Sequence, residues 1–240
     1  MRRAAIATLL LSSLGVALTY TTSFSGTENP ISESGNWING AATGVDWSNV
    51  RKTPGFAFGT QTGSGANYTD SLAVLTGSWG PTQTVQATVH IGTAPTTGFE
   101  EIEVLAHFSI SANSAQGYEL NCSVNTSASP YMQIVRWNGT VGDFTLLDAK
   151  AVGPCVEGDT IKMTISGTTI TAYYNGTSQF SVTDGTFSGG NPGIGFYLQG
   201  ATGIAGNYGH SDFTATDGLS TYSGGVISGP GVHAGPGVFR

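Results

Sequence analysis

Two glutamates stand two residues apart in the segment FEEIEVLAHF, residues 99–108. Apolar and polar side chains alternate through this segment, which is typical of a strand with one buried face. The alternation predicts that Glu101, Glu103 and His107 share the polar face. Carboxylates at alternate positions of one strand lie within reach of the spacing of a retaining glycosidase's two carboxyl groups, about 5 to 5.5 Å. The segment therefore carries either a catalytic pair or one solvated face of a sheet.

The composition predicts an all-β domain. The 240 residues include 36 glycines, only 10% are charged, and 39% are hydrophobic, which is enough for a core. Helix-favouring Glu, Lys and Arg are scarce, whereas β-branched and aromatic residues are plentiful. The net charge of −7 and the lack of a basic patch argue against binding to nucleic acid, which needs clustered Lys and Arg.

Short alternating segments separated by Gly, Asn and Pro turns indicate a two-sheet antiparallel β-sandwich. No segment beyond the N-terminus shows a helical period, and there is no phosphate-binding loop or G-x-S-x-G motif. The most regular expected strands cover residues 82–91, 99–110, 117–124, 130–139, 144–152 and a hairpin over 158–176.

The sequences at the two ends of the chain predict a secretory signal peptide and a C-terminal tail. Two arginines and an apolar run place a secretory signal peptide at 1–22, followed by one domain at 23–217. We expect a secreted or cell-envelope protein with no membrane span after signal cleavage. Residues 218–240 are rich in Gly and Pro and carry apolar side chains, so they are a candidate arm for self-association.

The chain has two cysteines, Cys122 and Cys155. In an oxidising compartment an even pair forms a disulfide. A metal site would want C-x-x-C spacing or nearby histidines, and the sequence has neither.

The segment GDTIKMTISGTTITAYYNGT, residues 158–177, resembles a hairpin of the concanavalin A-like lectin/glucanase superfamily, including its laminin-G-like members. The matching positions are Asp159, Tyr174, Asn175 and Gly176. NPGIGFYLQG at 191–200 resembles the fold's next strand, and HSDFTATD resembles its closing strand. The resemblance implies a concanavalin A-like jelly roll, a fold that hosts binders, hydrolases and lyases. It also makes Asp212 and Asp217 candidate calcium ligands near the end of the domain, although no cofactor is expected to be required.

Two enzyme hypotheses are weaker than a binding role. Glucanases of this superfamily carry a Glu-x-Asp-x-(x)-Glu strand, and here Glu103 replaces the Asp while Leu105 or Ala106 replaces the last Glu. A lyase would use His107, Gln133, Arg136 and a tyrosine, but Val135 stands where a Gln-Ile-His strand would have its histidine.

The preferred prediction is noncatalytic, lectin-like recognition of a glycan on a concave sheet. Amides, carboxylates and aromatic rings on neighbouring strands would line the groove. Glu119 extends the same surface, although a solvated face explains it better than a ligand contact does. The candidate ligand-binding residues are Glu101, Glu103, His107, Asn121, Gln133, Trp137, Tyr173, Tyr197 and Gln199. The alternatives are a polysaccharide-active enzyme and a structural protein that assembles through its C-terminal arm.

Overall fold

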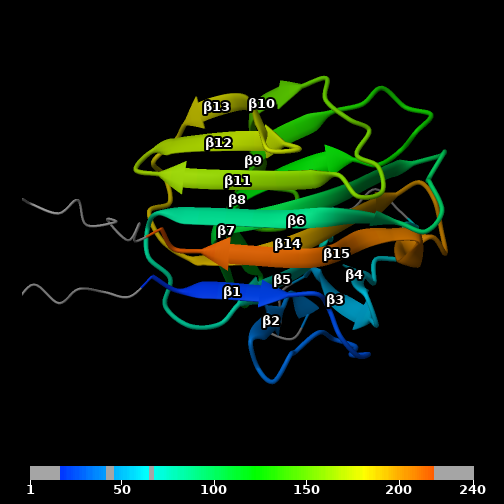
Figure 1. Cartoon of the computed structure of the whole chain (residues 1–240), viewed down its shortest axis with the longest axis horizontal. Helices are drawn as coiled ribbons and strands as arrows, with labels where there is room; N and C mark the ends of the chain where they lie inside the picture. The colour runs from blue at the N-terminus through cyan, green and yellow to red at the C-terminus, as the bar shows by residue number, and fades with distance from the viewer. Residues whose placement is uncertain (1–16, 42–45, 65–67, 219–240) are drawn as a thin grey trace, which may run out of the picture.

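The computed structural model describes residues 17–41, 46–64 and 68–218 of the chain. Two sheets pack face to face, and nearly all the regular structure is β-strand (Figure 1). Most of the predicted signal peptide and nearly all of the predicted arm lie outside the described residues. Within those residues, no helix is long and apolar enough to cross a membrane.

The first sheet, named here the β6 sheet, has a central strand that pairs antiparallel with β15 and β11. The strand order is β4-β15-β6-β11-β12-β13, and β1 also pairs with β15. The strands are β1 (Thr19–Thr22), β4 (Phe56–Gly59), β6 (Gln83–Ile91), β11 (Thr160–Ser166), β12 (Thr169–Tyr174), β13 (Thr177–Thr183) and β15 (Tyr208–Thr216).

The second sheet, the β7 sheet, runs in the order β10-β9-β8-β7-β14-β5, with β2 beside β5. Its strands are β2 (Trp37–Asn39), β5 (Ser71–Leu75), β7 (Phe99–Ser111), β8 (Ser114–Ser123), β9 (Met132–Gly139), β10 (Phe144–Lys150) and β14 (Asn191–Gln199).

Strand β3 (Ser48–Thr53) joins the two sheets. It pairs antiparallel with β4 and parallel with β5, where Ser48 lies opposite Ser71. The prediction of an antiparallel β-sandwich is confirmed apart from this short parallel pair. The 3-10 turn η2 (Ala205–Asn207) precedes β15.

The core forms between the sheets from alternate residues of each strand. Val85, Ala87 and Val89 of β6 are fully buried, as are Ile102 and Val104 of β7. The predicted hairpin at 158–176 forms β11 and β12, which pair across the predicted turn. Because the side-chain period of a strand is two, the residues between these core positions point to the outer faces.

A second apolar cluster covers part of the outer face of the β7 sheet. Trp47 packs edge-on against Trp137, with ring centroids 5.9 Å apart. The other buried members are Leu72, Val74, Leu105, Phe108, Ala115 and Val135. This cluster shields the neighbouring outer-face residues from water, so polar groups beside it are also buried.

The predicted disulfide is confirmed. Cys122 of β8 and Cys155 are bonded, with an S–S distance of 2.01 Å. The bond ties the β7 sheet to the segment that leads into β11 of the other sheet. Closing a loop of 33 residues contributes roughly 3 to 4 kcal/mol in the chain-entropy model.

The N-terminal boundary of the domain stays a prediction. Thr19–Thr22, the last four residues of the predicted signal peptide, form β1 and pair with Phe213–Thr216 of β15. A cleavage site before Thr19 would keep this strand in the mature protein.

Candidate functional site

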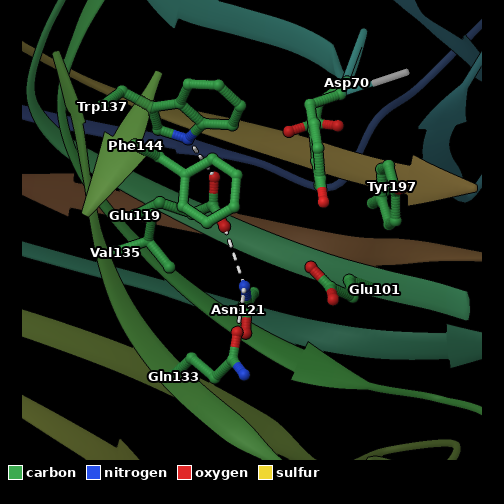
Figure 2. A pocket seen from close by; sticks show the side chains of 10 residues that line it. Asp70, Glu101, Glu119, Asn121, Gln133, Val135, Trp137, Phe144 and Tyr197 are labelled. Carbon is green, nitrogen blue, oxygen red and sulfur yellow. Dashed lines mark hydrogen bonds between the residues drawn. The ribbon is translucent and has the colours of Figure 1, made fainter. Parts of the chain in front are cut away.

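A pocket of about 90 Å³ opens on the outer face of the β7 sheet (Figure 2). Its walls combine aromatic rings with carboxyl and amide groups from β7, β8, β9, β10, β14 and the segment before β5. The lining residues are Tyr68, Asp70, Glu101, Glu119, Asn121, Gln133, Val135, Trp137, Phe144 and Tyr197.

Strand pairing brings the polar groups together. Glu103 of β7 lies opposite Asn121 of β8, and Asn121 lies opposite Gln133 of β9. Leu105 lies opposite Glu119. Cross-strand neighbours on one face are about 4.5 to 5.5 Å apart, so alternation within strands and register between them place these residues in one patch.

Hydrogen bonds hold Glu119 in a single orientation. Trp137 Nε1 donates to Glu119 Oε2 at 2.6 Å, and Asn121 Nδ2 donates to Glu119 Oε1 at 2.9 Å. Figure 2 shows both bonds, with Gln133 next to Asn121. Glu101, which is partly exposed, accepts a hydrogen bond from the Tyr131 hydroxyl.

Beneath the pocket, Asp70, Glu103 and Glu119 form what we name the acid cluster. Each offers a carboxylate oxygen, and these oxygens lie within 4.8 Å of one another. Glu103 is fully buried, and neither of its oxygens has a hydrogen-bond partner among the described residues. Asp70 Oδ1 is likewise buried and unpartnered there.

Gly195 makes room for the Glu103 carboxylate. A Cβ at this position would lie 2.0 Å from Glu103 Oε2. Any side chain on this face of β14 would therefore displace the carboxylate. The missing side chain of Gly195 thus gives the acidic group its space, a close approach that glycine permits within a strand.

Burial raises the pKa values of these carboxyl groups. It raises the pKa of Glu101 to about 8, with a further contribution from the charge of Glu119. Burial, followed by repulsion from Glu119, raises the pKa of both Asp70 and Glu103 well above the ordinary range. The pKa of Glu119 is raised by burial, against the opposing hydrogen bonds from Trp137 and Asn121.

This arrangement supports three kinds of chemistry. The amides and carboxyl groups can bond sugar hydroxyls, which both donate and accept. A protonated carboxyl beside a carboxylate can act as an acid and a base. Three carboxylates at this spacing can also ligate a cation.

Five of the predicted ligand-binding residues line the pocket, and two others lie against it. The pocket contains Glu101, Asn121, Gln133, Trp137 and Tyr197. Glu103 lies in the acid cluster, and the Tyr197 hydroxyl donates to Gln199 Oε1 at 2.7 Å.

Two predicted residues lie elsewhere. A register shift between Ala106 and Ser109 interrupts the alternation of β7, so His107 does not share the face of Glu101. Its ring nitrogens contact the carbonyls of Pro81 and Phe187 instead. Tyr173 is on β12 of the other sheet, under the Lys162 ammonium group.

The two candidate calcium ligands near the end of the domain bond the backbone instead. Asp212 Oδ1 accepts from the Thr88 amide at 3.2 Å. Asp217 accepts from the amides of Leu18 and Gly80 at 2.7 and 3.1 Å. They are not part of the acid cluster, and a calcium role for them stays a prediction.

Sequence reasoning missed Asp70, Tyr68 and Phe144 and underweighted Glu119. Asp70 directly precedes β5, whose five residues are all buried. An acidic residue next to such a buried segment is the local sequence feature that could have indicated a site residue. Glu119 lies two residues before Asn121 on an alternating strand, so it shares that residue's face. Only the register of β8 shows that it lies opposite Leu105, where the glucanase-like pattern of β7 lacks its last carboxylate.

Comparison with solved structures shows the fold. The carbohydrate-binding module CBM66 from Bacillus subtilis aligns with a TM-score of 0.52 and 14% identity over 78% of this chain and 95% of that chain. A GlcNAcα1-4Gal-releasing endo-β-galactosidase from Clostridium perfringens aligns with a TM-score of 0.53 and 12% identity, over 88% of this chain and 64% of that chain.

A third similar structure is the κ-carrageenase from Pseudoalteromonas carrageenovora, with a TM-score of 0.50 and 9% identity over 89% of this chain and 99% of that chain. No protein-family model and no curated protein sequence matches this chain. The sheet order, the strand pairing and these three likenesses agree, and the chain has the concanavalin A-like fold.

Proposed function

We propose that the protein binds a carbohydrate, without cleaving it, at the pocket on the outer face of the β7 sheet. The observation that carries the proposal is the combination of aromatic rings with amide and carboxyl groups around one opening. Aromatic side chains present an apolar face to sugar rings, while the polar groups bond the hydroxyls. The likeness to a carbohydrate-binding module supports a binding role on this fold.

Tyr68 supplies the exposed aromatic surface. Its side chain is 43% exposed, and its ring lies nearly parallel to that of Tyr197, with centroids 6.0 Å apart. Phe144 also packs edge-on against Tyr68, with ring centroids 5.0 Å apart. The Tyr68 ring is thus held at the mouth of the pocket, where a sugar ring can stack on it.

The pocket volume favours the end of a glycan over an internal segment. About 90 Å³ is well below the roughly 300 to 1,000 Å³ of pockets that enclose whole drug-sized ligands. We infer that one edge of a terminal sugar enters, with its hydroxyls directed at Glu101, Asn121 and Gln133.

A glycan array followed by calorimetry on the best ligand tests this proposal. Tyr68→Ala and Gln133→Ala should each weaken binding by at least about tenfold, since each removes a stacking or hydrogen-bonding contact. Tyr173→Ala is the matched control, because Tyr173 is an aromatic residue on the opposite sheet. Binding that depends on Tyr173 and not on Tyr68 would place the glycan elsewhere.

Hydrolysis of a polysaccharide is the second candidate. The observation that favours it is the position of Glu119 opposite Leu105, which brings a carboxylate into the gap of the Glu101–Glu103 strand. With its pKa raised to about 8, Glu101 is protonated at neutral pH and can serve as the acid. Hydrogen bonds from Trp137 and Asn121 favour the charged form of Glu119. The likeness to the endo-β-galactosidase and the κ-carrageenase makes the test worthwhile.

Release of new reducing ends from β-linked polysaccharides distinguishes the two candidates. An enzyme would lose this activity in both Glu101→Gln and Glu119→Gln. A binder would release none, and its Glu101→Gln variant would still retain the glycan, more weakly. Activity that survives both substitutions would exclude these carboxyl groups as catalytic residues.

A further inference from the structure

We infer that Asp70, Glu103 and Glu119 together hold one divalent cation, best suited to Ca²⁺, beneath the pocket. The site differs from the calcium ligands expected near the end of the domain. It stands independently of the glycan proposal, because it rests on the buried oxygens of the acid cluster and not on the aromatic walls.

The carboxylate oxygens of the three acids are close enough together to bind one ion. One oxygen from each of the three residues lies within 4.8 Å of the other two. Oxygens bound to one Ca²⁺ at 2.3 to 2.6 Å can be at most about 5 Å apart. The three carboxyl groups therefore already have a spacing that a single ion can bridge without rearrangement of the strands.

Several carboxylate oxygens of the acid cluster are buried and lack hydrogen-bond partners among the described residues. Glu103 is 0% exposed and is directed into the cluster, yet neither of its oxygens accepts a hydrogen bond from a described residue. Asp70, 3% exposed, has an unpartnered Oδ1. Burying a carboxylate without a hydrogen bond or counter-charge costs several kcal/mol, so such groups are normally paired or coordinate a metal.

No basic side chain among the ion pairs of the described residues neutralises the acid cluster. In the part of the chain that the structure describes, the ion pairs involve Lys52, His90, Arg136 and Lys150, and none of these reaches the acid cluster. Three carboxylates bring up to three negative charges into one buried volume. A divalent cation neutralises most of that charge, which no side chain found here does.

The set of donor atoms favours calcium. All three ligands are hard oxygens, which excludes the softer metals that prefer thiolate or imidazole. Carboxylates that bind through one or both oxygens give the flexible, high coordination number of Ca²⁺, whereas Mg²⁺ demands a strict octahedron. Asn121, which bonds Glu119, adds a buried and unpartnered Oδ1, and the pocket gives water access from outside.

Calorimetric titration of the EDTA-treated full chain with CaCl₂ at pH 7.5 tests the inference. We expect saturable binding with a Kd below about 1 mM, the upper range of extracellular calcium modules. Tb³⁺ should replace Ca²⁺ and show emission excited through tryptophan, because Trp137 is hydrogen-bonded to Glu119. Added Ca²⁺ should suppress that emission.

Variants locate the ion. Glu103→Gln and Asp70→Asn should each weaken Ca²⁺ binding by at least about 100-fold, since loss of outer-shell partners alone costs 10- to 100-fold. The matched control is Glu100→Gln, a buried glutamate on the same strand whose side chain lies on the opposite face. Circular dichroism of each variant confirms folding, and two different ligand variants guard against the failure of one.

Two results would overturn the inference. One is the absence of saturable Ca²⁺ binding to the folded chain, in which case protons alone relieve the repulsion within the cluster. The other is unchanged affinity in both ligand variants. Neither result bears on the glycan proposal, which is tested separately through Tyr68 and Gln133 in calcium-free buffer.

Discussion

A partly buried glutamate and a fully buried one have opposite surroundings in this protein. Glu33, beside β1 and β2, accepts hydrogen bonds from Thr22 Oγ1 at 2.7 Å, Trp37 Nε1 at 2.9 Å and Lys52 Nζ at 2.9 Å, and also from the Tyr20 hydroxyl. Glu103, at the centre of the β7 sheet, accepts none from the described residues.

The pKa values of the two glutamates move in opposite directions. Burial alone would raise the pKa of Glu33, but the hydrogen bonds from Tyr20, Trp37 and Lys52 outweigh it and lower the pKa. For Glu103, burial and the nearby charges of Glu119 and Asp70 all act in the same direction and raise the pKa.

The two acids differ in the partners that the fold provides for them. Around Glu33, the fold supplies every partner that the carboxylate needs, so the group stabilises the junction of β1, β2 and β3. Around Glu103, the fold concentrates like charges, and the described residues supply no hydrogen-bond donor to its carboxylate. A protein retains such an arrangement at a cost in stability, and perturbed acids of this kind are concentrated at functional sites.

The largest change in the free energy of unfolding that we expect comes from breaking the network of hydrogen bonds and the ion pair around Glu33. Lys52→Met should lower the free energy of unfolding by about 3 kcal/mol, because it removes a buried ammonium group and leaves the partly buried Glu33 carboxylate without its counter-charge. Chemical denaturation at neutral pH measures the change.

Lys150→Met is the control for that substitution. Lys150 is 48% exposed in its side chain and pairs with Asp148 on the surface, so its removal should lower the free energy of unfolding far less than removal of Lys52 does. Equal losses for the two lysines would show that the Glu33 network is not the stabilising element described here.

Removing one negative charge should change the free energy of unfolding by a smaller amount. The change should have opposite signs at Glu33 and at Glu103. Glu33→Gln should destabilise the protein by about 2 kcal/mol, since it weakens charge-assisted hydrogen bonds. In calcium-free buffer, Glu103→Gln should stabilise it by about 1 kcal/mol, because the new amide can donate to an unpartnered carboxylate such as Asp70.

Denaturation of both glutamine variants beside the wild type measures this difference. Glu100→Gln again provides a buried glutamate outside the acid cluster. If Glu103→Gln destabilises the protein as much as Glu33→Gln does, the Glu103 carboxylate has stabilising partners and the contrast between the regions is lost.

The smallest expected effect is the pH dependence of the Glu33 contribution. The folded pKa of Glu33 lies below the ordinary 4.5, so its stabilisation is present above that pH and is lost as the pH falls through the folded value. The stability difference between wild type and Glu33→Gln should therefore shrink from neutral pH toward about pH 3.

The charged and titratable groups near Glu33 are Tyr20, Lys52 and Glu28. Burial raises the pKa of Tyr20, so this group stays protonated in the acid range. Comparison with the variant cancels titrations elsewhere in the molecule. A difference that stays constant down to pH 3 would mean that Glu33 keeps its charge throughout or contributes nothing through it.

Much of the fold could be predicted because strand patterns are local. The alternation in β6, β11 and β12 marked the core residues correctly, and the 158–176 hairpin has the expected pairing. The disulfide followed from there being only two cysteines. The parallel β3–β5 pair could not be predicted, because pairing between distant segments leaves no mark on either one.

The candidate site was only partly predictable, for the same reason. The face of β7 was predicted correctly as far as Leu105, but the register shift after Ala106 moved His107 away from the site. Nothing near FEEIEVLAHF indicates that Asp70 approaches it, since the two come from strands separated by β14 in the sheet.

The sequence by itself determined the alternation, the sandwich class and the acidic character of one strand, because these depend on residue types and their period. Only the tertiary structure decided that Glu101 and Glu103 do not lie on a fully solvated face. The register of β8 added Glu119, the segment before β5 added Asp70, and the apolar cluster around Trp137 excluded water from them. Burial and register are properties of the assembled sheet, and they turn two ordinary glutamates into part of a site.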